Sequence, residues 1–386
     1  MDNFNFYNPV KILFGKGKIT ELSDNLPESA KILFVYGGGS IKKNGIYNQV
    51  VDNLKGFEFY EYGGIKPNPS YEECLGALDI IKEKGINFLL AVGGGSVIDA
   101  TKFIAAAALY EGNDPWDIVG KGVEVKDALP IGVVLTLPAT GSEMNINSVM
   151  TKKETAEKLP FKSQKVYPKF SILDPEYSFS LPKRQIVNGV IDAFIHVMEQ
   201  YLTYPVNSPV QDRFAEGVLL TLIEEGRKAV ASDKPDYNNR ANITWAATMA
   251  LNGILAVGVK SCWATHAIGH ELTALHGLDH AVSLTIVLPG LLDKKRNERK
   301  EKILQYGERV WNITEGTDDE RIDKTIEKTE SFFNELGVKT RLRDYNIGTD
   351  TVDFIVNRYK NRGLSAIGLQ KDISLDDVKE ILMSRL

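Results

Sequence analysis

The sequence has only two cysteines, Cys74 and Cys262, among its 386 residues. Two cysteines are too few for the disulfide framework of a small secreted protein. The start of the chain also lacks the basic segment and following apolar segment that mark a secretion signal. We therefore expect a cytoplasmic protein that folds around a hydrophobic core rather than around cross-links.

Long apolar runs are absent as well. The most apolar long stretch, residues 245 to 259, is shorter than a bilayer span and contains Asn252 and Gly253. This stretch predicts a buried helix of a large core, and we expect no membrane segment. The chain has no internal repeat and no low-complexity tract.

Charge of one sign is not in excess. The 46 basic and 51 acidic side chains give a net charge of −5, and the lysines and arginines are scattered. Binding to a nucleic-acid backbone requires a concentrated basic surface, so we expect no nucleic-acid partner. Hydrophobic residues at 43% and charged residues at 25% are typical of a globular protein, and the length favours two domains.

Several catalytic motifs are missing. His270-Glu271 begins the H-E-x-x-H pattern of a zinc protease, but residue 274 is alanine. There is no G-x-S-x-G nucleophile elbow and no P-loop. The usual dinucleotide fingerprint G-x-G-x-x-G is absent too, since Lys42 and Ile98 stand at its last position.

The two halves of the chain differ in their hydrophobic period. Short apolar runs at residues 31 to 36, 88 to 92 and 131 to 137 alternate with helical patterns at 71 to 84 and 97 to 109. This alternation predicts an α/β domain with a parallel sheet over residues 1 to 180. Residues 181 to 386 predict an all-helical domain, with helices near 188–203, 208–231, 238–256, 262–275, 295–312, 319–336 and 375–385. A ligand site is expected between two such domains.

Two glycine loops follow two of the apolar runs. Each run ends in Gly-Gly-Gly-Ser, at residues 37 to 40 and 93 to 96, and a helical pattern follows. Such a turn lets the backbone and a helix N-terminus approach a phosphate. Alternatively, the glycines serve only tight turns, and Ser40 and Ser96 cap the helices. A third segment, residues 136 to 143, ends another strand with small hydroxyl residues that could reach a ribose.

All five histidines lie between residues 196 and 280. Asp192 and His196 are four residues apart, as are His266 and His270, so each pair shares a helix face. Carboxylate and imidazole groups at this spacing suit Fe(II) or Zn(II). A single helical histidine is more often a packing residue, but the cluster favours a metal site. Spacing leaves open which of the five bind: His196, His266, His270, His276 and His280.

Five ordered motifs together resemble the iron-containing alcohol dehydrogenase family, most closely its NADPH-dependent butanol dehydrogenase and aldehyde reductase branch. They are GGGSIKKNG (37–45), GGGSVIDATK (93–102), TLPATGSE (136–143), NGVIDAFIHVMEQY (188–201) and WATHAIGHELTALHGLDHA (263–281). The resemblance implies a dehydroquinate synthase-like architecture with an α/β dinucleotide domain, a helical domain and one divalent metal. It implies the metal ligands Asp192, His196, His266 and His280, and it makes His270 a catalytic residue beside the nicotinamide that relays a proton.

The resemblance also assigns the coenzyme site. It places Asp99 near the nicotinamide as a second catalytic residue. NAD-preferring relatives carry an aspartate where this chain has Gly39, so we expect a preference for NADP(H) over NAD(H), with Lys42 or Lys43 adding positive charge. The residues assigned to the coenzyme are Gly37, Gly38, Gly39, Ser40, Lys43, Gly94, Gly95, Ser96, Asp99, Thr136, Leu137, Thr140, Ser142 and Lys158.

The expected reaction is hydride transfer between NADP(H) and a primary alcohol/aldehyde couple of the butanol/butyraldehyde type, with aldehyde reduction favoured. A homodimer is implied by the resemblance, through the segment from Phe4 to Phe14. One alternative is a metal-dependent lyase or cyclase of the dehydroquinate synthase type, but few basic side chains that could hold its anionic substrate lie near the metal motifs. Another is a non-catalytic metal-binding module.

Overall fold

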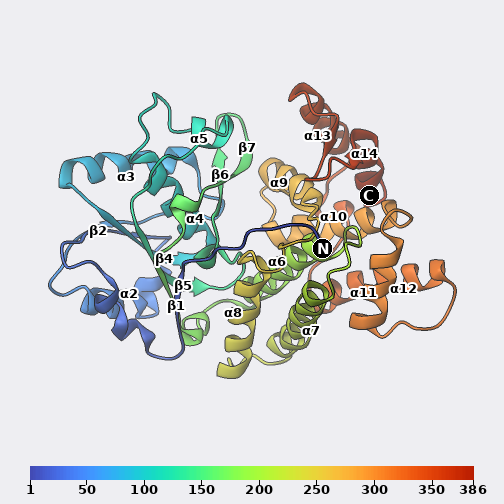
Figure 1. Ribbon diagram of the computed structural model, residues 1–386, viewed down its shortest axis with the longest axis horizontal. Coiled ribbons are helices and arrows are strands. Elements are labelled where there is room, and N and C mark those ends of the chain that lie inside the picture. The colour runs from blue at the N-terminus through green and yellow to red at the C-terminus, as the bar shows by residue number, and fades with distance from the viewer. The chain divides into compact units, whose positions relative to one another are not determined.

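The computed structural model describes residues 1–386, and the chain divides into two compact units (Figure 1). The sheet unit consists of Tyr7–Ile186 and Lys234–Thr248, and the helical unit of Met1–Phe6, Val187–Asp233 and Met249–Leu386. The units therefore exchange segments: the first six residues pack with the helical unit, and most of helix α8 (Tyr237–Leu251) packs with the sheet unit.

A six-stranded parallel sheet forms the centre of the sheet unit. The strand order is β1-β8-β5-β4-β2-β3. The connections from β2 to β3, from β3 to β4 and from β4 to β5 contain α-helices, as is usual for parallel pairing, whereas β5 and β8 are joined through a two-stranded hairpin. The strands are β1 (Lys11–Phe14), β2 (Lys31–Tyr36), β3 (Glu58–Tyr62), β4 (Phe88–Gly94), β5 (Ile131–Leu137) and β8 (Phe170–Leu173).

Both faces of this sheet are buried, in two separate cores. Alternate residues of β2 point to opposite faces: Leu33 and Val35 join the core under α3 (Tyr71–Lys84) and α4 (Gly95–Ala107), whereas Ile32 and Phe34 join the core under α2 (Ile46–Asn53). This explains why the strands read as continuous apolar runs. The remaining elements are α1 (Ser40–Lys43), α5 (Asp117–Gly120) and the antiparallel hairpin β6 (Asn147–Lys152) and β7 (Glu157–Lys162).

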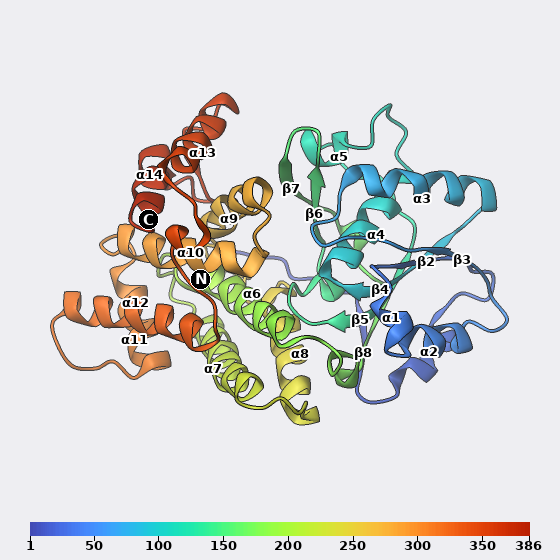
Figure 2. The same ribbon diagram turned by 180° about the vertical axis from the view of Figure 1, so that it is seen from behind.

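Helices make up most of the other unit, and Figure 2 shows α9 beside α10 and α13 beside α14. A single core joins these four helices through buried residues such as Ile268, Leu291, Ile355 and Ile381. The helices are α6 (Lys183–Tyr201), α7 (Pro209–Ala231), α9 (Ala264–His276), α10 (His280–Lys294), α11 (Lys300–Trp311), α12 (Asp318–Glu335), α13 (Thr349–Asn361) and α14 (Leu375–Met383), with a short pair of strands β9 (Ala366–Ile367) and β10 (Ile373–Ser374).

The predicted fold class is confirmed, but several elements differ from the prediction. Residues 245 to 259 do not form one buried helix, because α8 ends at Leu251, Gly253 has a left-handed φ of 97°, and Trp245 is 42% exposed. Helix α10 lacks a predicted counterpart because nearly all of its length is buried, which removes the polar face that marks an amphipathic helix. None of the helices combines the length and apolar character that crossing a bilayer requires.

Candidate coenzyme and metal sites

Both glycine loops lie at the point in the sheet where the direction in which the chain adds strands reverses. Strands β2 and β4 are neighbours, and the chain leaves β2 toward β3 on one side and leaves β4 toward β5 on the other. In open α/β sheets, ligands bind outside the carboxyl ends of the strands at such a point. Residues 37 to 40 follow the end of β2, and residues 93 to 96 are the last two residues of β4 and the first two of α4, so the topology supports the predicted dinucleotide site.

The second loop is closely packed against its surroundings. A Cβ atom at Gly94 would lie 2.9 Å from Leu137 Cβ, and one at Gly95 would lie 2.5 Å from Thr140 Cγ2 and Oγ1. Gly94 is also the N-cap of α4, and no side chain caps this helix. The alternative that Ser96 caps α4 is therefore wrong, and the first N–H groups of the helix remain available for a ligand.

A network of polar and charged groups, most of them buried, supports the start of α4. Asp99 accepts from Ser142 Oγ at 2.7 Å and from the backbone N–H of Val149 at 3.0 Å. The Nζ of Lys102, which is fully buried, donates to Ser142 Oγ at 2.9 Å and to two oxygens of Asn145. Burial lowers the pKa of Lys102 to about 8, and burial also raises the pKa of Asp99. Asp99 and Ser142 are thus held in fixed positions beside the loop.

The first loop is open by comparison. Cβ atoms added at Gly38 and Gly39 would meet no atom within 4 Å, and Ser40 is exposed. Gly39 has φ 91° and is the N-cap of α1, so Ser40 does not cap that helix as the alternative proposed. Lys42 and Lys43 are both exposed beside the loop. The Nζ of Lys42 stands over the ring of Tyr47 and bonds to Glu61 at 3.2 Å.

The remaining predicted coenzyme residues lie on β5, in the turn that follows it, and on β7. Thr136 and Leu137 end β5, and the hydroxyl of Thr140 accepts from the backbone N–H of Ser142 at 3.2 Å. Lys158 of β7 donates to Asn68 Oδ1 at 2.8 Å. These residues belong to the same unit as both glycine loops.

In the helical unit, α6 and α9 bring three predicted metal ligands together. One donor atom each from Asp192, His196 and His266 lies within 4.8 Å of the others, and all three residues are buried. The Nε2 of His196 lies 3.6 Å from Asp192 Oδ1, and the rings of His196 and His266 stack with centroids 4.8 Å apart. The i, i+4 spacing on α6 therefore places both of its candidate ligands on one face, as predicted.

These residues fit a divalent cation. The Nδ1 of His196 and the Nε2 of His266 are buried and have no hydrogen-bond partner in the structure. Burial, together with the neighbouring His266, holds the pKa of His196 well below its usual value, so this imidazole stays neutral. Neutral imidazoles and a carboxylate are the ligands that Fe(II) and Zn(II) take in proteins.

The other histidines differ in their distance from this group. His280 begins α10, and its Nε2 lies 3.8 Å from Asp192 Oδ1. The half-buried ring of His270 has its centroid 5.0 Å from that of His280 and 6.2 Å from that of His266. His276 is exposed at the end of α9 and pairs with Thr351 Oγ1 at 3.0 Å.

Sequence reasoning missed three polar residues of these sites. Asn188 of α6 donates to Asp279 Oδ2 at 2.7 Å and so ties the start of α10 to α6. Glu199 of α6 binds the start of α9. The signal was present, since both share the helix face of the α6 candidate ligands at a spacing of three or four residues. Lys102 lies three residues after Asp99, on the same side of α4.

Comparison with known proteins agrees with this geometry. Residues 9–175 match the family described as iron-containing alcohol dehydrogenase, and residues 186–386 match the C-terminal region of the Fe-containing alcohol dehydrogenase family. The NADPH-dependent aldehyde reductase YqhD of Escherichia coli is 53% identical over 383 residues, which cover 99% of each chain. The chain belongs to the iron-containing alcohol dehydrogenase family.

Other members of the iron-containing alcohol dehydrogenase family are similar along their whole length. NADH-dependent butanol dehydrogenase A of Clostridium acetobutylicum is 38% identical and covers 99% of each chain. The crystal structure of E. coli YqhD has a TM-score of 0.97 at 52% identity and covers 100% of this chain and 99% of its own. The structure of NADH-dependent butanol dehydrogenase A from Thermotoga maritima has a TM-score of 0.95 at 38% identity, with the same coverage. The predicted family and its two-part architecture are confirmed.

Proposed function

We propose that this member of the family is a metal-dependent aldehyde reductase that uses NADPH to convert small aldehydes to primary alcohols. The observation that carries the proposal is the buried group of Asp192, His196 and His266, with two imidazole nitrogens left for a cation. The glycine loops at the switch point of the sheet supply the matching coenzyme site.

In this proposal Asp192, His196, His266 and His280 hold the metal. A divalent metal bound there supplies a Lewis acid at the carbonyl oxygen, where negative charge develops as hydride is transferred. Four protein ligands of this kind suit either Fe(II) or Zn(II). Burial of the three closest residues excludes water from the site and strengthens their interaction with the cation.

The sheet unit binds the coenzyme. Gly94, Gly95 and Ser96 at the uncapped N-terminus of α4 would hold the pyrophosphate, whose charge the N–H groups and the helix dipole attract. The open first loop would hold the 2′-phosphate of NADP(H), because Gly39 adds no carboxylate and Lys42 and Lys43 add positive charge. Relatives named for NADH and for NADPH both resemble this chain, so the preference rests on these residues.

His270 completes the reaction by supplying the proton that the alcohol oxygen needs. It stands one helical turn after His266, with its ring centroid 5.0 Å from that of His280. A half-buried imidazole at this place can exchange its proton with solvent and deliver it to the oxygen. The enzyme acts as a homodimer in this proposal, which sedimentation analysis of the purified protein tests directly.

Oxidation of NADPH in the presence of butyraldehyde tests the proposal. The reductase should consume one NADPH for each aldehyde reduced, and NADH should give a lower kcat/KM. A chelator should abolish the reaction, and Fe(II) or Zn(II) should restore it. A lyase or cyclase would leave NADPH unconsumed over many turnovers, and a binding module would show no reaction, so either result contradicts the proposal.

A further inference from the structure

Helix α9, which carries His266, begins without a capping side chain of its own. Its N-cap residue, Trp263, has a left-handed backbone with φ 67° and ψ 13°, and its side chain makes no capping hydrogen bond. Non-glycine residues are strained in this conformation, and the first N–H groups of a helix find no partner within it. Groups outside α9 must therefore hold this turn.

Glu199 of α6 makes these contacts. Its Oε2 accepts from the backbone N–H of Trp263 at 2.8 Å, and its Oε1 accepts from the backbone N–H of His266 at 3.0 Å. Its main-chain oxygen accepts from Cys262 N at 2.8 Å. Glu199 is only 3% exposed, so these N–H groups take the place of water around the carboxylate.

The same carboxylate also reaches the imidazole of His266. Glu199 Oε1 lies 3.2 Å from His266 Nδ1, while His266 Nε2 is buried without a hydrogen-bond partner. An ionised carboxylate can only accept, so this contact places the ring proton on Nδ1 and leaves the lone pair on Nε2. That lone pair is the one available to a cation.

We infer that Glu199 is a positioning residue for the metal site, which orients the His266 ring and sets its tautomer while it caps α9. The inference rests on the metal site of the proposed function. Glu199 stands seven residues after Asp192 and three after His196, so one face of α6 supplies two ligands and the group that orients a third. Both Glu199 oxygens accept N–H groups, which separates its role from that of the ligands.

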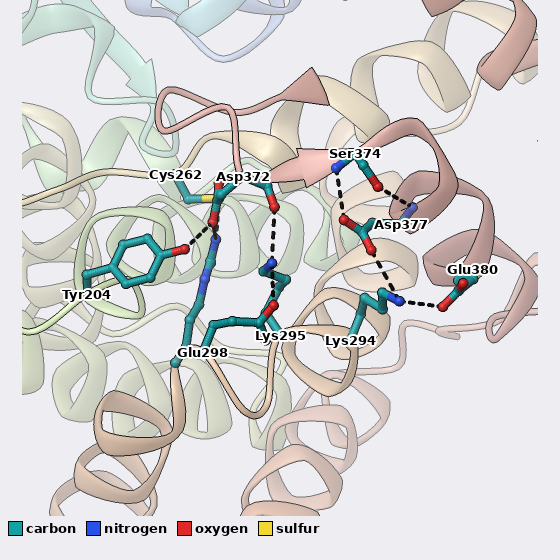
Figure 3. A network of polar contacts seen from close by, with 10 residues as sticks. Tyr204, Cys262, Lys294, Lys295, Glu298, Asp372, Ser374, Asp377 and Glu380 are labelled. Atoms are coloured by element: carbon teal, nitrogen blue, oxygen red, sulfur yellow. Dashed lines mark hydrogen bonds and ion pairs between the residues drawn. The ribbon is translucent and has the colours of Figure 1, made fainter. Parts of the chain in front are cut away.

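The turn that Glu199 caps is also held from its other side. Arg299 Nη2 donates to Cys262 Sγ at 3.2 Å and to Asp372 Oδ2 at 3.0 Å, and the Tyr204 hydroxyl donates to the same oxygen of Asp372 at 2.7 Å. Figure 3 shows Tyr204, Cys262 and Asp372 meeting in this network. This second network remains when Glu199 is changed. A substitution at Glu199 should therefore alter mainly the orientation and tautomer of the His266 imidazole.

The variant Glu199→Gln tests the inference. Glutamine keeps the size of the side chain but has one oxygen acceptor and no charge, so it cannot accept from both Trp263 and His266, and any contact it keeps with Nδ1 is weaker. The matched control is Glu216→Gln on α7. Glu216 is also buried and carries hydrogen bonds from Tyr201 and Arg309, but it contacts none of the candidate ligands.

Metal-free protein titrated with Zn²⁺ against a chromophoric chelator gives the Kd, and Co²⁺ gives an absorption spectrum of the ligand field. We expect Glu199→Gln to raise the Kd for Zn²⁺ by about 10- to 100-fold and to change the Co²⁺ spectrum. Glu216→Gln should lower thermal stability but leave both metal readouts at their wild-type values.

Two results would overturn the inference, and they differ in whether the proposed function also fails. If Glu199→Gln loses stability but keeps the wild-type Kd and Co²⁺ spectrum, Glu199 is only a helix cap, and the proposed function stands. If the wild-type protein binds neither ion, the metal site itself is wrong, and both proposals fall.

Wild-type protein offers a second measurement in case Glu199→Gln does not fold. Selective ¹⁵N labelling of histidine reports which ring nitrogen of His266 carries the proton in the zinc-loaded protein. We expect the proton on Nδ1 and none on Nε2. A proton on Nε2 would contradict the assigned contact with Glu199.

Discussion

The two glycine loops have the same sequence, Gly-Gly-Gly-Ser, but very different surroundings. In the second loop, Cβ atoms at Gly94 and Gly95 would collide with Leu137 and Thr140, whereas in the first loop a Cβ at Gly39 meets nothing within 4 Å. The loops also differ in their lysines: Lys102 is buried behind the second, and Lys42 is exposed beside the first. Under the proposed function, this contrast leads us to expect that changes in the second loop affect the binding of any coenzyme, whereas changes in the first affect the choice between NADPH and NADH.

The largest effect should come from the buried lysine. Burial lowers the pKa of Lys102 from 10.5 to about 8. As the pH rises, the folded protein therefore releases the Lys102 ammonium proton at a lower pH than the unfolded chain does. The unfolded chain then holds more protons between these values, so the free energy of unfolding rises with pH. Compared with Lys102→Met, the wild-type protein should gain about 3 kcal/mol between pH 8 and 10.5.

Urea denaturation at several pH values measures this difference. The exposed counterpart Lys42→Met is the control, because its pKa is raised by hydrogen bonds to Tyr36 and Glu61 and the lysine stays charged across this range. The difference between wild type and Lys42→Met should therefore stay flat. If the stability difference between wild type and Lys102→Met also does not change with pH, the two lysines titrate alike, and the contrast between the buried and the exposed lysine is wrong.

The next largest effect should come from Gly95→Ala. The added Cβ would stand 2.5 Å from Thr140, so the loop or α4 must shift. Overpacking of this kind typically costs about 1 to 3 kcal/mol, and a loss of binding free energy of that size would raise the Kd for NADPH by roughly 5- to 150-fold. Fluorescence titration with NADPH measures this, and Gly38→Ala, where a Cβ would meet no protein atom within 4 Å, should raise the Kd less. Equal Kd values for the two variants would refute the contrast.

A smaller effect with a clear direction should follow Gly39→Asp. The new carboxylate would repel a 2′-phosphate, so kcat/KM for NADPH should fall by about tenfold, while that for NADH falls much less. Gly39→Asn has the same size and meets the same left-handed backbone at φ 91°, but it carries no charge. Steady-state kinetics with both coenzymes separate the effect of the charge from that of backbone strain. An equal loss of kcat/KM for NADPH in the two variants would count against binding of the 2′-phosphate at this loop.

The smallest effect should come from Lys42→Gln. This exposed lysine contributes at most a salt-screened attraction, so the KM for NADPH should rise by about two- to fivefold at low ionic strength. High salt should remove the difference, and the KM for NADH should not change. The control for a general loss of charge is Lys55→Gln, because Lys55 is an exposed lysine just after α2 that pairs with Asp52. An equal rise for both coenzymes would assign Lys42 a structural role.

Sequence alone predicted the features that depend on local spacing. Helix α3 has the predicted bounds of residues 71 to 84, and the four-residue spacing of Asp192 and His196 placed both on one face of α6. It could not predict contacts between distant segments. The tie from Glu199 to Trp263 joins residues 64 positions apart, and Lys102 reaches Asn145 across 43 positions.

The hairpin of β6 and β7 illustrates the same limit. Its strands contain Pro160 and several lysines, which give no apolar alternation that a pattern could detect. The difference between the two glycine loops was equally hidden, because it depends on which side chains pack behind each loop and not on the loops themselves.

The exchanged segments of the two units bear on how this protein can be divided. Residues 1 to 6 belong to the helical unit, and residues 234 to 248 belong to the sheet unit. A single cut near residue 186 would leave each fragment without part of its own packing and with a piece of the other. We therefore expect that neither half folds by itself, and that a split version of the protein regains its structure only when both fragments are produced together.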